Sequence, residues 1–105
     1  MEARDLLQRV KDNLIIDFSD DDELIVSFIA ASIQYAESYQ HLEEKYYEAN
    51  TMNETTKQAV IMLASHFYES RDGGTGGLFS NSVSASEQVW KTVNTLLRLD
   101  RVWKV

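Results

Sequence analysis

Residues 19–39 read SDDDELIVSFIAASIQYAESY, and this stretch decides the fold class. Ser19 is a favourable N-cap residue, and the acidic residues at 20–23 would meet the positive end of a helix dipole. Apolar residues then recur at the i, i+4, i+7, i+11 spacing of one helix face. The stretch therefore predicts an amphipathic helix roughly 30 Å long. Its expected apolar face consists of Leu24, Phe28, Ala31 and Tyr35, flanked by Ile25, Ser32 and Tyr39.

Two more helices are expected on either side of this one. A short helix over about residues 3–13 would place Leu6, Leu7, Val10 and Leu14 on one face. A longer helix is expected from Asn53 to Asp72, capped by Thr51 with Glu54 or by Asn53 itself. Its apolar face is broad enough to predict a central position in the packing. That face consists of Ala59, Val60, Met62, Leu63, Ala64 and Phe67.

The second half of the chain adds a flexible loop, a fourth helix and a tail. Glycine and serine in residues 73–84 predict the loop. The Ser84-Ala85-Ser86-Glu87 sequence matches a capping box and would open the last helix. Alternating apolar and charged residues in 99–105 favour a short extended tail. The expected fold is one all-α domain over 1–105, a bundle of about four helices with its helical core in 1–98. The conformation of residues 40–52 stays open.

Composition excludes several functional classes. The chain has 44% hydrophobic and 26% charged residues, as ordinary soluble globular proteins do. Its net charge of −7 disfavours binding to phosphate backbones or anionic membranes. The lack of cysteine removes disulfides, thiol nucleophiles and thiolate metal sites. Neither a signal-peptide core nor an apolar run of membrane-spanning length is present, so a cytosolic protein without membrane partners is expected.

The acidic run at residues 17–23 partly matches a calcium-binding loop. Asp17, Ser19, Asp21 and Glu23 occupy template positions 1, 3, 5 and 7. Position 6, which needs glycine, is aspartate, and position 12, which needs glutamate, is Phe28. A helix cap explains the same residues completely, so no metal site is expected.

No catalytic or cofactor-binding constellation is recognisable either. The glycine loop lacks the Lys-Ser/Thr ending of a phosphate-binding loop, and no strand precedes it. His41 and His66 lie in different segments and form no metal or triad motif. His66 is best explained as a packed or hydrogen-bonding histidine. A non-enzymatic protein without cofactors is therefore expected.

The aromatic content exceeds what a small core requires, and the surplus suggests binding surfaces. Partial burial is the simpler explanation for aromatic residues at helical spacing. Tryptophan, tyrosine and arginine are nevertheless the usual hot spots of protein interfaces. The candidate interface residues are Trp103, Arg101, Arg98, Trp90, Phe79 and Leu78.

Residues 57–71, KQAVIMLASHFYESR, resemble the signature helix of the phage head–tail connector family. These are adaptor proteins of long-tailed double-stranded DNA bacteriophages and their prophages. The Ile16-Asp17 pair before an acidic run and a long helix also resembles the family, as does the loop over 72–84. The ending with Leu96-Leu97 and then Arg101-Val102-Trp103 is similar too. The family's proline at the start of the signature helix is missing, and residues 40–52 match nothing in the pattern.

The resemblance implies a helical adaptor that forms a ring on the portal and receives head-closure or tail proteins. Its partners would be other copies of the chain, the portal and those proteins. It would assemble in the bacterial cytoplasm and end at the head–tail junction of the virion. An acidic ring lining would repel DNA phosphates and let DNA slide. The alternative is a small cytosolic helical protein-binding module, regulator or antitoxin-like, although none of the expected helices supplies a basic recognition helix for DNA.

Overall fold

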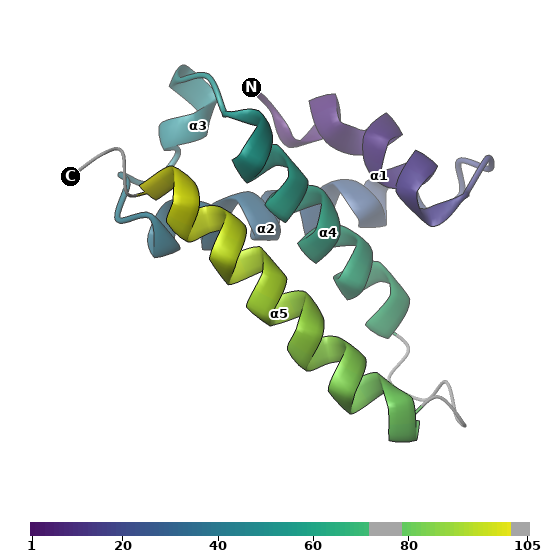
Figure 1. The fold of residues 1–105 in the computed structure, drawn as a ribbon. Helices are drawn as coiled ribbons and strands as arrows, with labels where there is room; N and C mark the ends of the chain where they lie inside the picture. The colour runs from purple at the N-terminus through teal and green to yellow at the C-terminus, as the bar shows by residue number, and fades with distance from the viewer. Residues whose placement is uncertain (72–78, 102–105) are drawn as a thin grey trace.

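The computed structural model describes the backbone of residues 1–71 and 79–101 and the side chains of 1–71 and 86–100. Within these residues all regular structure is helical (Figure 1). Four long helices and two short helical segments confirm the predicted small all-α bundle. The elements are η1 (Ala3–Leu6), α1 (Leu7–Leu14), α2 (Asp22–Tyr39), α3 (Tyr46–Ala49), α4 (Glu54–Ser70) and α5 (Phe79–Arg101).

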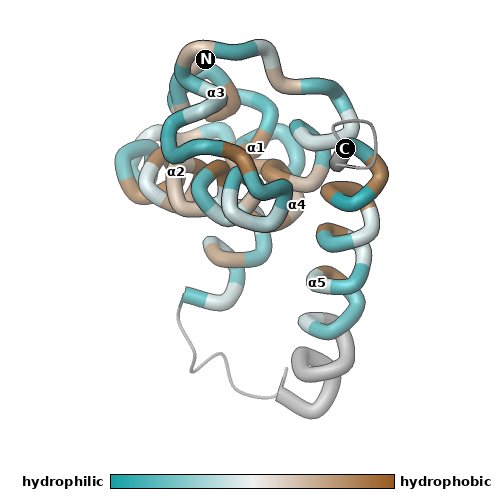
Figure 2. The backbone as a smooth tube through the Cα atoms, turned by 90° about the vertical axis from the view of Figure 1, so that its left-hand side faces the viewer, coloured by the Kyte–Doolittle hydropathy of each residue, from teal (hydrophilic) through white to brown (hydrophobic). Residues whose placement is uncertain are grey.

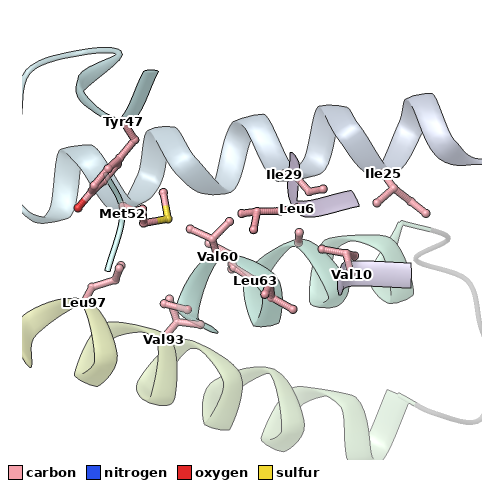
Figure 3. Close-up of a cluster of buried hydrophobic side chains, with 14 of the residues drawn as sticks. Leu6, Val10, Ile25, Ile29, Tyr47, Met52, Val60, Leu63, Val93 and Leu97 are labelled. Atoms are coloured by element: carbon pink, nitrogen blue, oxygen red, sulfur yellow. The ribbon is translucent and has the colours of Figure 1, made fainter. Parts of the chain in front are cut away.

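Helix α4 lies at the centre of the packing, as its broad apolar face predicts. It contacts α2, α1 and α5, and Figure 3 shows it between α2 and α5. Figure 2 shows α5 as a rod standing beside the other helices. The largest fully buried apolar side chains come from all of these elements. They are Tyr47, Ile25, Ile29, Leu63, Leu97, Val10, Val60 and Val93.

The buried face of α2 is rotated by one residue from the predicted face. Four residues of α2 are buried, namely Ile25, Ile29, Ser32 and Ala36. Of the predicted face, Phe28 and Tyr35 are only partly covered, and Leu24 and Ala31 are exposed. Apolar or small residues occupy most of positions 24–36, so the sequence offers two adjacent stripes of similar hydrophobicity. Packing against α1 and α4 selects the second stripe.

The start of α2 also differs from the prediction. The helix begins at Asp22, and its N-cap position is Asp21 rather than Ser19. The Asp21 side chain makes no capping hydrogen bond. Its carboxylate instead accepts a hydrogen bond from the Tyr68 hydroxyl, and the Asp22 carboxylate lies 2.8 Å from the Lys11 ammonium. Two residues of the acidic run therefore tie α2 to α4 and α1.

Helix α5 is longer than predicted at both ends. It begins at Phe79, so the Ser84–Glu87 sequence lies inside the helix and the predicted 73–84 loop is shorter. The glycines end at 77, and residues 79–83 contain neither glycine nor proline to oppose a helix. At the other end α5 continues to Arg101, so the first three residues of the predicted extended tail are helical. Residues 72–78 and 102–105 lie outside the described part.

The segment over 40–52, which the sequence leaves open, contains a turn and the short helix α3. His41 and Lys45 adopt the left-handed region at φ 59° and φ 65°. They reverse the chain, so that Tyr47 of α3 is buried against α2. Figure 1 shows α3 at the same end of the molecule as the last turn of α5.

Candidate assembly surfaces

A buried hydrogen-bonded network joins α3, the end of α2, the start of α4 and the end of α5. The Tyr47 hydroxyl donates to Oε1 of Gln40 at 2.5 Å. Nε2 of Gln40 donates to Oγ1 of Thr56 at 2.9 Å. Thr56 in turn donates to Oδ2 of Asp100 at 2.5 Å, and Asn53 donates to Oδ1 at 2.6 Å. These bonds fix the last turn of α5 on the helical body.

Asp100 also changes the predicted cap of α4. Asn53 occupies the N-cap position, but its side chain donates to Asp100 and makes no capping hydrogen bond. The Asp100 carboxylate is only 5% exposed and lies against the first turn of α4, where negative charge is favourable. This tertiary contact explains why residues 99–101 are helical, because an extended chain would lose it.

Residues of α3 are held by a second buried carboxylate. Glu37 accepts hydrogen bonds from the backbone N–H groups of Lys45 and Tyr47 at 3.2 and 3.0 Å. Burial of the Tyr47 phenol raises its pKa to about 12, because the charged form would lose its hydration. The polar groups at this end of the bundle thus serve to hold α3 in place.

Trp90, one of the predicted interface residues, contacts three aromatic rings inside the molecule. Its ring centroid lies 5.2 Å from that of Tyr35, 6.1 Å from that of Phe67 and 6.5 Å from that of His66. Nε2 of His66 lies 3.2 Å from the Ser86 hydroxyl. Packing between α2, α4 and α5 accounts for the partial burial of Trp90, and its role in an interface stays a prediction.

The other predicted interface residues lie at the two ends of α5 or beyond them. Arg98 is exposed on α5. Phe79 and Arg101 are the terminal residues of that helix, and their side chains are not among those described. Leu78 and Trp103 lie outside the described residues. Arg98 is therefore the one predicted residue whose described side chain is mainly solvent-facing.

Sequence reasoning missed a group of exposed hydrophobic side chains. Ile15 is 92% exposed and Phe18 is 47% exposed, both in the segment between α1 and α2. Leu99, on α5, is 54% exposed, and Leu24 is also exposed. A signal was available, because Ile15 and Phe18 interrupt the helical pattern and fall outside any predicted apolar face. These residues are the described part of the surface best suited to meet another protein.

The described residues contain neither a candidate metal site nor a candidate membrane-spanning helix. Across the described residues, no cluster of three histidine, aspartate or glutamate side chains is arranged to hold a metal ion. The carboxylates of Asp21 and Asp22 have protein partners, as described above. No helix in the described ranges combines the length and apolarity needed to cross a membrane.

A comparison with protein families finds a match that covers nearly the whole chain. The model of the Phage gp6-like head-tail connector protein family matches residues 4–101. The chain belongs to this family. The match confirms the resemblance seen in the sequence, and it runs from η1 to the last residue of α5. No curated protein and no solved structure matches the chain. A phage head–tail connector has a structural role, at the junction of head and tail in the virion.

Proposed function

We propose that this connector forms a ring that docks on the portal and joins the DNA-filled head to head-closure or tail proteins. It would assemble in the bacterial cytoplasm before it becomes part of the virion. The observation that carries the proposal is the family match over residues 4–101, which covers all of the described helical residues except Ala3. A helical body that exposes Ile15 and Phe18 in one loop and Leu99 on α5 also suits a subunit that has more than one neighbour.

The charge of the chain supports passage of DNA through such a ring without binding. The net charge is −7, and a negative lining repels phosphates at short range. DNA would then slide during packaging and ejection. Assembled rings are expected to leave linear DNA unbound at physiological salt in a filter-binding assay, and retention of DNA would contradict this part of the proposal.

Assembly is tested by light scattering and by binding to heads. The purified chain is run on size-exclusion chromatography with multi-angle light scattering over increasing concentration. It is then incubated with phage heads that carry a portal and, as a control, with particles that lack one. A ring at the portal vertex, seen by electron microscopy only on portal-bearing heads, is the expected result. A chain that stays monomeric and binds neither particle would refute the proposal.

A truncation tests the role of the C-terminal segment. Asp100 is the last buried residue described, so deletion of 101–105 retains the network around it. The truncated chain is expected to remain a folded monomer that no longer assembles. Far-ultraviolet circular dichroism provides the control: a large loss of helix would assign the segment to the core instead of the interface.

A further inference from the structure

The segment between α1 and α2 places two apolar side chains in water. Ile15 and Phe18 are among the most exposed large hydrophobic residues of the described chain. Asn13 anchors the segment from the other side, since its Nδ2 donates to Oγ of Ser65 at 2.8 Å. The loop is thus held against α4 while Ile15 and Phe18 face the solvent.

The backbone at Ile15 makes this arrangement more unusual. Ile15 ends α1 in the left-handed conformation, with φ 59° and ψ 50°. The Ile16 N–H donates to the Lys11 carbonyl at 2.9 Å, so the helix-ending hydrogen bond holds Ile15 in that conformation. Glycine is the usual residue here, because a Cβ is disfavoured in this region and a branched one most of all. In the isolated chain, isoleucine therefore contributes strain and exposed apolar surface, and both suit a residue that becomes covered in a complex.

The charges around the loop indicate what would cover it. Asp12, Asp17 and Asp20 are all exposed, whereas the nearby cations Lys11 and Arg71 already lie beside Asp22 and Asp21. A partner must therefore offer an apolar contact for Ile15 and Phe18, surrounded by positive charge. We name this surface, formed by 12–20, the acidic loop.

The outer face of α5 over residues 91–99 has this complementary character. Lys91 and Arg98 are seven residues apart on the helix and so share a face, and both are exposed. Leu99 beside them is 54% exposed. Figure 1 shows the acidic loop and the C-terminal half of α5 at opposite ends of the molecule. Complementary surfaces at opposite ends of one chain make head-to-tail contacts, which close into rings when the rotation allows it.

We infer that the acidic loop of one copy binds the outer face of α5 on the next copy, with Ile15 and Phe18 against Leu99 and the aspartates beside Lys91 and Arg98. This inference rests on the proposed ring and names the two surfaces that build it.

Charge reversal tests the contact directly. One variant carries Asp17→Lys and Asp20→Lys, and the other carries Lys91→Glu and Arg98→Glu. Each alone presents two surfaces of the same sign and is expected to lose multimers in sedimentation velocity. When the two variants are mixed in equal amounts, the acidic loop of each variant can meet the α5 face of the other, which has the opposite charge. Multimers in which the two variants alternate should therefore form again. If mixing restores nothing while each variant remains helical, the charge pairing is wrong.

The matched control moves the same charge elsewhere. Glu43→Lys with Glu44→Lys reverses two exposed acids in the turn before α3 and changes the net charge equally. This variant should assemble as the unmodified chain does. An equal loss of assembly in the control would show that total charge, and not the acidic loop, governs association.

Cysteine cross-linking supplies a second readout, since the chain has no cysteine of its own. A mixture of the Ile15→Cys and Leu99→Cys proteins should form disulfide-linked dimers under mild oxidation. A Gln58→Cys protein, with its cysteine at an exposed position of α4, should not cross-link in place of either one. If the unmodified chain forms multimers but the two cysteine variants do not cross-link selectively, the proposed contact is wrong and the proposed ring still stands. A monomeric chain, in solution and on portal-bearing heads, would remove the ring itself.

Discussion

Replacing Ile15 by glycine should make the isolated chain more stable, although it removes a large apolar side chain. With 92% of that residue exposed, almost no buried contact is lost. Glycine adopts the left-handed conformation at φ 59° without a clash of Cβ, which raises the free energy of unfolding by about 1–2 kcal/mol. Glycine makes the unfolded chain more flexible, which subtracts roughly 0.5–1 kcal/mol. The expected net gain in the free energy of unfolding is about 0–1.5 kcal/mol, with a midpoint of about 0.75 kcal/mol.

The measurement is urea unfolding followed by circular dichroism at a concentration where the chain is monomeric. The midpoint should rise with an unchanged slope. In a thermal scan, a gain of 1 kcal/mol corresponds to roughly 4–8 °C for a domain of 60–100 residues and to slightly less for a longer chain.

Ile15→Ala is the matched control, because alanine keeps the Cβ atom and therefore most of the strain. Its stability should remain within about 0.5 kcal/mol of the unmodified chain. Both variants lose the apolar anchor, so both should assemble less well. A glycine variant no more stable than the alanine variant would refute the assignment of strain to Ile15. A stabilised glycine variant that still assembles fully would refute the use of Ile15 as an anchor.

Four more substitutions test the description of the fold. Leu97→Ala should lower the free energy of unfolding by about 2–5 kcal/mol, because the Leu97 side chain is buried. Leu99→Ala on the same helix should change it by less than about 0.5 kcal/mol, because Leu99 is exposed. Equal losses for the two variants in urea unfolding would contradict the assigned buried face of α5. Asp100→Ala should cost about 1–3 kcal/mol by leaving the donors of Asn53 and Thr56 unpaired, and calorimetry showing no change would contradict the network. Because the pKa of Tyr47 is raised to about 12, the unfolded chain ionises first, and the free energy of unfolding should fall by about 2 kcal/mol between pH 10 and 12. The free energy of unfolding of Tyr47→Phe should fall less over that range. An equal fall in the variant and the unmodified chain, measured by unfolding at each pH, would contradict the pKa assignment.

The sequence predicts the fold class because the apolar residues recur with the period of a helix over long segments, and these helical faces form the core. The broad apolar face over 59–67 indicates a central helix, and α4 has that position. The predicted phase of α2 is wrong by one residue, because Leu24 and Ile25 each begin an apolar stripe. Choosing between them requires knowing which neighbours pack there, and helical periodicity does not contain that information.

The missed features have a common physical origin. Asp21, Asp22 and Asn53 are good capping residues by type, yet each uses its side chain for a tertiary contact. A tertiary partner competes with the local backbone, and only the folded structure shows which one is chosen. The interruption of the helical pattern at Ile15 is a signal in the sequence, but only the structure shows that this side chain is exposed and that its backbone is left-handed. Of the candidate interface residues, the sequence located Arg98 on the described surface, whereas the acidic loop required the structure.

The contact of Asp100 with the first turn of α4 links the motions of two helix ends far apart in the sequence. The first turn of a helix usually frays, so its amide protons exchange quickly with solvent. Here Asn53 and Thr56 are both bonded to a residue of α5. That turn can open freely only when the last turn of α5 also separates. The two ends should therefore exchange hydrogen together, as one cooperative unit, and a partner bound at the end of α5 should slow exchange at the start of α4.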